Sequence, residues 1–252
     1  MEQIKVLGIR VTSARLGELH REISRMIAEG RKGFVLYANV HGFNVAYKSK
    51  WLTDFYNRAD LVNCDGAGII IGARILGKHI PERITYADWG WTLGEYCAKK
   101  GHSLYFLGGP EGVTDRAAEN LKEKIPDINI SGTFHGYFQK QGPENDAVIA
   151  RINQAKPDIL LVGMGIGMQE KWLLENYEKI DAKVFMVCGA AFRYWAGWYA
   201  RCPKWMADNG LEWLFRFLLE PRRLAKRYLL GNPLFMIRIL AERLKMKHSQ
   251  EN

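Results

Sequence analysis

Residues 156–174, KPDILLVGMGIGMQEKWLL, pass from an apolar run through a glycine-rich turn into a predicted helix. The apolar run 159–162 has the length of a strand and follows Pro157 and Asp158, which is typical of a strand buried on both faces of a parallel sheet. Gly163, Gly165 and Gly167 then allow the backbone to pass close to a bound group. This order predicts one strand–turn–helix unit of an α/β fold with a ligand site at the turn.

The helix after this turn begins near Gln169 and Glu170, and the free N–H groups of its first turn favour an anion. A nucleotide diphosphate is the obvious candidate. Met168 stands where the dinucleotide fingerprint requires its third glycine, which weakens a nicotinamide dehydrogenase. Taken alone, the turn fits a tight connection without a ligand equally well.

Other apolar runs of strand length alternate with helical patterns along the chain. Strands are predicted at 4–9, 34–38, 60–64, 103–107, 129–133, 159–162 and 183–188, and helices at 15–29, 43–58 and 69–75. The first strand, helix and second strand are expected to form a βαβ opening. The alternation predicts an α/β fold with a Rossmann-like, mostly parallel sheet flanked by helices.

The last fifth of the chain differs in charge and pattern. Residues 201–252 hold 11 Lys and Arg against 5 Asp and Glu, a net +6 of the chain's +9. A first apolar helix is expected to end at Pro221, a second to end at residues 231–233, and a basic amphipathic helix to cover 234–247. We therefore predict an α/β domain at 1–200 and a C-terminal basic helical appendage at 201–252. Its pattern suits an anionic membrane surface, and packing on the domain or on a protein partner is the alternative.

Composition excludes several classes of protein. The chain has 252 residues and 48% hydrophobic content, enough for a sizeable core. Its four cysteines form no C-x-x-C pair, which favours reduced thiols in a cytosolic protein. The opening residues lack the pattern of a signal peptide, and no apolar run approaches the roughly 18 residues of a spanning helix. No nucleic-acid motif accompanies the basic tail.

In parallel sheets the ligand sits beyond the carboxyl ends of the strands. An Asn, an Asp and several glycine turns follow the predicted strands, and we expect them to meet at one edge: Asn39, Asp65, Gly108, Gly109, Gly136, Tyr137, Gly163 to Gln169, Gly189 and Ala190. No D-x-D triplet is present, and the six histidines show no ligand spacing. We therefore expect neither a metal ion nor a cofactor.

Several separated motifs occur in an order that resembles the WecG/TagA/CpsF bacterial glycosyltransferases, from about Ile4 to Arg243. The matching residues are Asn39; Asp65 to Gly68; Pro81 to Ile84 with Asp88; Leu107 to Gly109; His135 to Phe138; Gly163 to Gly165 with Gln169 and Glu170; Gly210 to Leu214; and Glu220 to Arg223. The resemblance implies an inverting, metal-independent transfer from a UDP-sugar to a polyprenyl-diphosphate-linked saccharide. It also implies peripheral attachment to the inner face of the cytoplasmic membrane in bacterial cell-surface or exopolysaccharide synthesis.

The resemblance also assigns roles to individual residues. Asp65 matches the proposed general base, and Arg83 and Gln169 join it and Asn39 as catalytic candidates. Binding of the UDP-sugar is expected at Gly108, Gly109, Tyr137, Gly163, Gly165, Glu170, Arg216, Arg223 and Arg227. With no metal ion, arginines and backbone amides must share the diphosphate charge.

Tyr37, Gly167 with Met168, and Ala191 with Arg193 depart from the family's usual pattern. These departures leave the donor open between an N-acetylmannosamine, a hexose and a hexuronic acid. A homo-oligomer is also left open. The alternative function is a non-catalytic nucleotide-binding module at the membrane surface, which would not need the Asp65 carboxylate.

Overall fold

The computed structural model describes residues 1–251 and contains a six-stranded parallel sheet covered by helices on both faces. Its strands run in the order β4-β3-β8-β7-β5-β6. Their bounds are β3 (Gly33–Ala38), β4 (Leu61–Cys64), β5 (Ser103–Gly108), β6 (Asn129–Phe134), β7 (Ile159–Gly163) and β8 (Val184–Val187). All five pairings are parallel. The predicted α/β class and parallel sheet are therefore confirmed.

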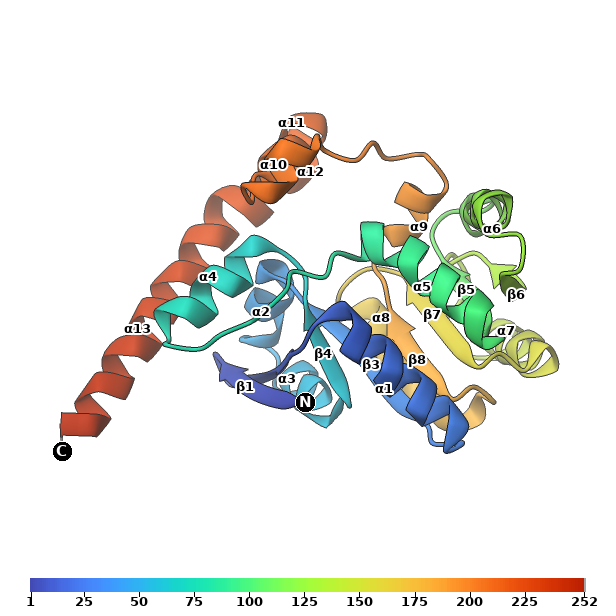
Figure 1. Cartoon of the computed structure of the whole chain (residues 1–252), viewed down its shortest axis with the longest axis horizontal. Helices are drawn as coiled ribbons and strands as arrows, with labels where there is room; N and C mark the ends of the chain where they lie inside the picture. Colours follow the sequence, from blue (N-terminus) through green and yellow to red (C-terminus); the bar gives the residue numbers. More distant parts are fainter. Residues whose placement is uncertain (252) are drawn as a thin grey trace.

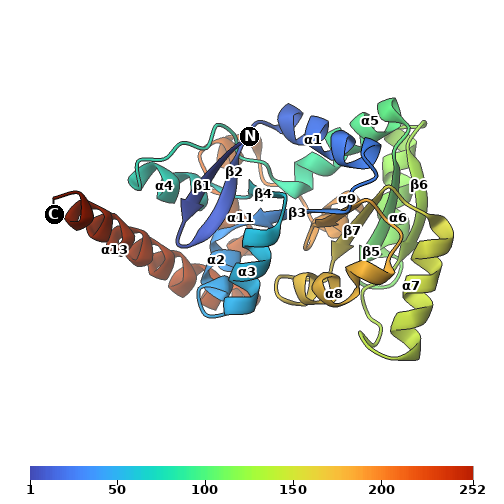
Figure 2. The same ribbon diagram turned by 90° about the horizontal axis from the view of Figure 1, so that it is seen from below.

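Helices precede the first of these strands, occupy the connections between them and follow the last. They are α1 (Leu16–Ala28), α2 (Val40–Ala46), α3 (Lys50–Arg58), α4 (Ala67–Ile75), α5 (Tyr86–Lys100), α6 (Val113–Lys124), α7 (Pro143–Ala155), α8 (Met168–Asn176), η1 (Tyr177–Lys179) and α9 (Ala191–Trp195). Figure 2 shows α1 and α5 over one face of the sheet and α3 and α8 over the other. The central strands β7 and β8 are fully buried between these layers, as their continuous apolar sequences predict.

The predicted βαβ opening is wrong. Residues 4–9 do not form one strand: β1 (Glu2–Val6) and β2 (Ile9–Ser13) form an antiparallel hairpin outside the main sheet. Leu7 and Gly8 make its two-residue turn with φ values of 46° and 84°. Such a turn suits the twist of a hairpin, and the sequence pattern masked it because Leu7 looks like part of an apolar strand. The helix predicted at 43–58 is also interrupted, between α2 and α3.

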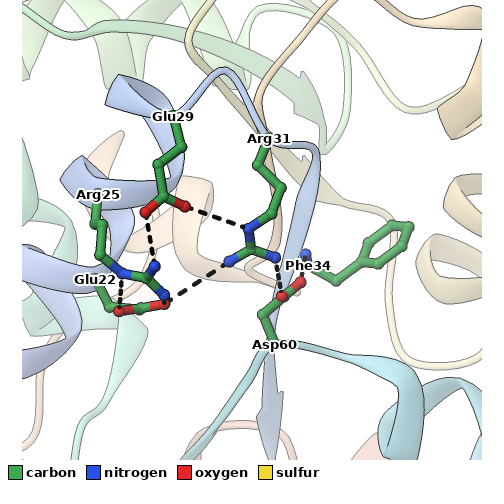
Figure 3. A network of polar contacts seen from close by, with 6 residues as sticks. All are labelled: Glu22, Arg25, Glu29, Arg31, Phe34 and Asp60. Atoms are coloured by element: carbon green, nitrogen blue, oxygen red, sulfur yellow. Dashed lines mark hydrogen bonds and ion pairs between the residues drawn. The ribbon is translucent and has the colours of Figure 1, made fainter.

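A polar network joins the amino-terminal ends of β3 and β4 (Figure 3). The Asp60 carboxylate accepts a hydrogen bond from the backbone N–H of Phe34 (2.8 Å) and pairs with Arg31, which also faces Glu22 and Glu29. These contacts fix the start of β3 beside the start of β4. The other ends of the same strands carry Asn39 and Asp65.

The C-terminal appendage contains α10 (Lys204–Asp208), α11 (Glu212–Leu219), α12 (Pro221–Ala225), the π-helical segment η2 (Lys226–Leu230) and α13 (Gly231–Glu251). Figure 1 shows α13 lying beside α2 and α4. The break expected at residues 231–233 is absent within this described segment. Pro233 falls in the first turn of α13, where its missing N–H costs little, and the wide π-helical turn precedes it.

The appendage packs on the α/β domain through buried apolar residues. Phe235 and Ile239 of α13 are 1% and 0% exposed. Both pack over Gly72 of α4, where an added Cβ atom would lie 3.1 Å from each side chain. Phe235 also meets Phe43 of α2 edge to face. Asn44 donates to the carbonyl oxygen of Gly231 (2.7 Å). The boundary predicted at residue 201 falls between α9 and α10, and independent folding of the two parts stays a prediction.

Candidate active site

A cavity of about 710 Å³ lies at the carboxyl ends of β5 and β7, and we call it the glycine-turn cavity. The connection from β5 leads through α6 to β6, whereas the connection from β7 leads through α8 to β8 on the other side. Two neighbouring strands with diverging connections create the crevice in which α/β sheets bind ligands. Of the predicted residues, Gly109, Tyr137, Gly163, Gly165 and Arg223 line this cavity.

The turns around this cavity pack backbone against backbone. The Gly109 N–H donates to the carbonyl oxygen of Gly163 (2.9 Å), and the Gly136 N–H donates to that of Gly109 (2.8 Å). A Cβ atom on Gly163 would lie 2.7 Å from the carbonyl oxygen of Gly189. Side chains are therefore excluded at these glycines, and the turns pack closely enough to bring their backbones to the wall of the cavity.

Gln169 and Glu170 are buried and line neither this cavity nor the second one described below. Glu170 accepts a hydrogen bond from the N–H of Gly167 (2.6 Å) and another from the Gln169 amide (2.8 Å). Gln169 in turn accepts from the N–H of Gly189 (3.1 Å). Both side chains thus join the turns after β7 and β8, and their predicted direct roles in catalysis and binding stay predictions.

A second cavity, of about 330 Å³, lies between the ends of β3 and β4 and the appendage, and we call it the Asp65 cavity. The predicted residues Asn39, Asp65, Arg83, Arg216 and Arg227 all line it. Asn39 caps α2 by accepting a hydrogen bond from the N–H of Gly42 (2.9 Å), and Asp65 donates its own N–H to Ala38 (2.9 Å). Adjacent strand ends therefore fix these two side chains, while the arginines come from elsewhere in the chain.

The electrostatics of the Asp65 cavity favour a proton acceptor near neutral pH. Burial raises the pKa of the Asp65 carboxyl to about 6, and the nearby Glu212 carboxylate adds to the rise. Arg216, Asn39 and Arg227 act in the opposite direction. Asp65 is thus ionised at pH 7 but binds a proton far more readily than an ordinary aspartate, as a general base requires.

Two of the arginines at this cavity form no salt bridge. Among the described side chains, those of residues 1–249, no carboxylate lies within 4.0 Å of the Arg216 or Arg227 guanidinium. Burial lowers the pKa of Arg227. Two guanidinium groups that line a cavity and are not tied up in salt bridges can bind a multiply charged anion such as a diphosphate.

Arg223 belongs to the other cavity. Its guanidinium pairs with Glu220, which also accepts a hydrogen bond from the Tyr199 hydroxyl (3.2 Å). Tyr199 in turn accepts one from Arg193 (2.7 Å). This chain of contacts connects the segment after β8 to α12 across the glycine-turn cavity. The three appendage arginines that the sequence grouped together therefore serve two cavities.

Several lining residues had no role predicted from the sequence: His41, Lys140, Tyr199 and Glu212. His41 follows Asn39 by two positions, so its place after a strand end was a usable signal. Burial and Arg227 lower its pKa to about 4, which leaves the imidazole neutral at pH 7. Glu212 lies in a motif of the family resemblance, but only the fold brings it close to Asp65.

Two structural findings relate to the predicted absence of a metal ion and to the predicted peripheral attachment to a membrane. Within the described chain, no three His, Cys, Asp or Glu side chains gather in an arrangement that could hold a metal ion. Among the helices of residues 1–251, none combines the length and apolarity needed to cross a bilayer. Metal independence stays a prediction.

Comparison with known proteins bears on identity. A family model described as "Glycosyl transferase WecG/TagA/CpsF family" matches residues 4–249. Two Staphylococcus aureus proteins, from strains MRSA252 and NCTC 8325 / PS 47, are each 26% identical over 98% of this chain and 96% of their own length. Both are named N-acetylglucosaminyldiphosphoundecaprenol N-acetyl-beta-D-mannosaminyltransferase. With the match extending over nearly the whole chain, the protein belongs to the WecG/TagA/CpsF glycosyltransferase family.

Proposed function

We propose that the protein transfers a sugar from a UDP-sugar to a polyprenyl-diphosphate-linked saccharide, with inversion and without a metal ion. The observation that carries this proposal is the Asp65 cavity, where a carboxylate with a raised pKa shares the lining with two arginines that form no salt bridge. The names of the relatives support the acceptor class, since they specify a sugar diphosphate on undecaprenol. The donor sugar is proposed only as a class.

In a single-displacement transfer, one cavity binds the donor and the other binds the acceptor hydroxyl. The UDP-sugar binds in the glycine-turn cavity, against the turns at Gly109 and Gly163 and the side chain of Tyr137. The acceptor hydroxyl enters beside Asp65, which takes its proton as the oxygen attacks the anomeric carbon from the face opposite the leaving UDP. Attack from that face inverts the anomeric centre, and one carboxylate is sufficient for it.

Charge on the diphosphates is balanced by arginines in place of a metal ion. Arg216 and Arg227 face the Asp65 cavity, and Arg223 faces the glycine-turn cavity. One guanidinium group can donate two parallel N–H hydrogen bonds to the oxygens of a phosphate. A small number of arginines can therefore stabilise a leaving diphosphate. Gln169 and Glu170 contribute by holding the turns that carry the backbone donors.

The appendage supplies the attachment to the inner face of the cytoplasmic membrane. Its described outer surface presents large aliphatic side chains: Leu218, Leu219, Leu229, Leu230, Ile237, Leu240 and Leu244, each more than half exposed. Arg222 and Lys226 are exposed among them. Aliphatic residues beside cations suit the interface of an anionic bilayer, and this would bring Asp65 to a lipid-linked acceptor.

A screen of UDP-sugars tests the proposal. Each is incubated with a polyprenyl-diphosphate-linked sugar, with and without EDTA, and UDP release and the extended lipid are measured. One UDP-sugar should yield both products at equal rates in the two conditions. Binding of UDP-sugars without transfer would favour the nucleotide-binding module, and loss of transfer in EDTA that Mg²⁺ or Mn²⁺ restores would refute metal independence.

A further inference from the structure

Glu212, the first residue of α11, bridges the appendage and the α/β domain at the mouth of the Asp65 cavity. One carboxylate oxygen lies 3.6 Å from Nη1 of Arg83, and the other accepts a hydrogen bond from Nη1 of Arg201 (2.8 Å). Arg201 also makes two hydrogen bonds to the Asp88 carboxylate (2.9 and 2.6 Å). Four charged side chains thus connect α5, the loop before it, the segment before α10, and α11.

Arg83 depends on this bridge for its position. Among the described side chains, which end at residue 249, Glu212 is the one carboxylate within 4.0 Å of the Arg83 guanidinium, and the Arg83 side chain is only 20% exposed. Since an arginine side chain has several rotatable bonds, a single partly buried partner decides where its guanidinium lies. That partner belongs to the appendage.

We propose that Glu212 is a positioning residue for the transfer: its carboxylate holds α11 over the Asp65 cavity and keeps Arg83 beside Asp65. The inference rests on the proposed function. It adds that the position of α11 and the position of Arg83 depend on the same carboxylate, because Glu212 contacts both Arg83 and Arg201.

The charges around Asp65 make this role measurable. Arg216 of α11 and Arg227 of η2 favour ionisation of Asp65, Glu212 disfavours it, and Arg83 lines the same cavity. Other titratable neighbours are neutral at pH 7, because burial lowers the pKa of His41 and raises the pKa of Tyr37, Cys64 and Tyr86. Glu212 is therefore the anion that disfavours ionisation of Asp65, and its removal must lower the pKa of Asp65.

Glu212→Gln tests the role by activity. The amide still accepts the hydrogen bond from Arg201 but carries no charge. The acidic limb of the kcat/KM pH profile should move to lower pH, and kcat should fall by about 10- to 100-fold because Arg83 is no longer held, since small misplacements cost that much. The KM for the UDP-sugar should change little, because Glu212 does not line the glycine-turn cavity.

Asp88→Asn is the matched control. It weakens the same bridge through Arg201 but leaves the Glu212 carboxylate in the cavity. A merely structural bridge predicts that both variants lose thermal stability and that neither moves the acidic limb. That result, or equal movement in both variants, overturns the proposal.

A stability cycle provides a readout without turnover. The gain in stability from Asp65→Asn is measured at pH 4 and pH 7 in the wild-type protein and in Glu212→Gln. The gain at pH 7 should be smaller in Glu212→Gln, and an equal gain in both backgrounds overturns the proposal. If no UDP-sugar is consumed by the wild-type protein, the proposed function fails while this cycle still decides whether Glu212 acts on Asp65.

Discussion

Gly108 and Gly163 contact each other through their backbones across the crevice between β5 and β7. A Cβ atom on Gly108 would lie 2.3 Å from the carbonyl oxygen of Gly163, and Gly108 has φ of 150°. Both facts exclude any other residue at position 108 without movement of the turn. The floor of the glycine-turn cavity therefore depends on two glycines that lie far apart in the sequence.

Gly108→Ala should lower both thermal stability and UDP affinity, because the turn must move away from Gly163. Thermal unfolding and calorimetric titration with UDP measure the two effects. Gly17→Ala is the control, since Gly17 lies in α1 with only a distant contact to Arg21 at 3.8 Å. Alanine there should leave binding intact and add up to about 1 kcal/mol of stability. Normal UDP affinity in Gly108→Ala would remove this turn from the binding site.

Asp65→Asn should raise the stability of the protein at pH 7. The pKa of Asp65 rises from 3.8 in the unfolded chain to about 6 in the folded protein. The ionised carboxylate therefore destabilises the folded state above pH 6, and this cost fades as the pH falls through 6 toward 4. Thermal unfolding of both proteins at pH 4 and pH 7 measures it. A variant less stable than the wild type at pH 7 would show that the carboxylate is favourably paired.

Arg227→Met should lower turnover of a short-chain, detergent-soluble acceptor by at least about tenfold while preserving the fold. The guanidinium is buried without a carboxylate partner, so its removal relieves a cost in the folded state and deprives the diphosphate of a cation. Arg222→Met is the control, because Arg222 is exposed on the same appendage and lines neither cavity. Equal activity of the two variants would contradict a role for Arg227 at the diphosphate.

Leu230→Asp combined with Ile237→Asp should release the protein from anionic vesicles without reducing turnover of the soluble acceptor. Both side chains are more than 60% exposed and neither lines a cavity. Trp51→Asp is the control, since Trp51 is an exposed apolar residue on α3 outside the appendage. Point variants are preferable to deletion of the tail, because Phe235 and Ile239 cover Gly72 and Phe43. Undiminished sedimentation of the double variant would show that this surface does not bind the membrane.

The sequence predicts most of the sheet and the edge at which the site lies. Runs such as 159–162 are apolar because both faces of the parallel sheet are covered, and the residues after them therefore meet at one edge. The hairpin at Leu7 was missed because its turn contains an apolar residue in the left-handed region. Composition cannot detect a conformation that tertiary packing selects.

Other features of the site depend on contacts between distant segments. Gln169 lies at the expected helix start, one residue after the observed start at Met168, yet its side chain is buried and accepts a hydrogen bond from Gly189. Glu212 stands 147 positions after Asp65 in the sequence, and no local pattern places it at the same cavity. The division of Arg223 and Arg227 between two cavities likewise follows from the path of α12 and η2 over the sheet edge.

Asp65 is proposed as the base of a glycosyl transfer. The most direct measurement compares wild-type and Asp65→Asn proteins for formation of the extended polyprenyl-diphosphate lipid by mass spectrometry, with UDP affinity measured in parallel. We expect the variant to lose about 10²- to 10⁴-fold in rate, the usual cost of a missing general base, while binding UDP as well as the wild type. The loss should match that seen in the wild type as the pH falls well below 6. An Asp65→Asn protein that forms the lipid product at the wild-type rate would contradict the account.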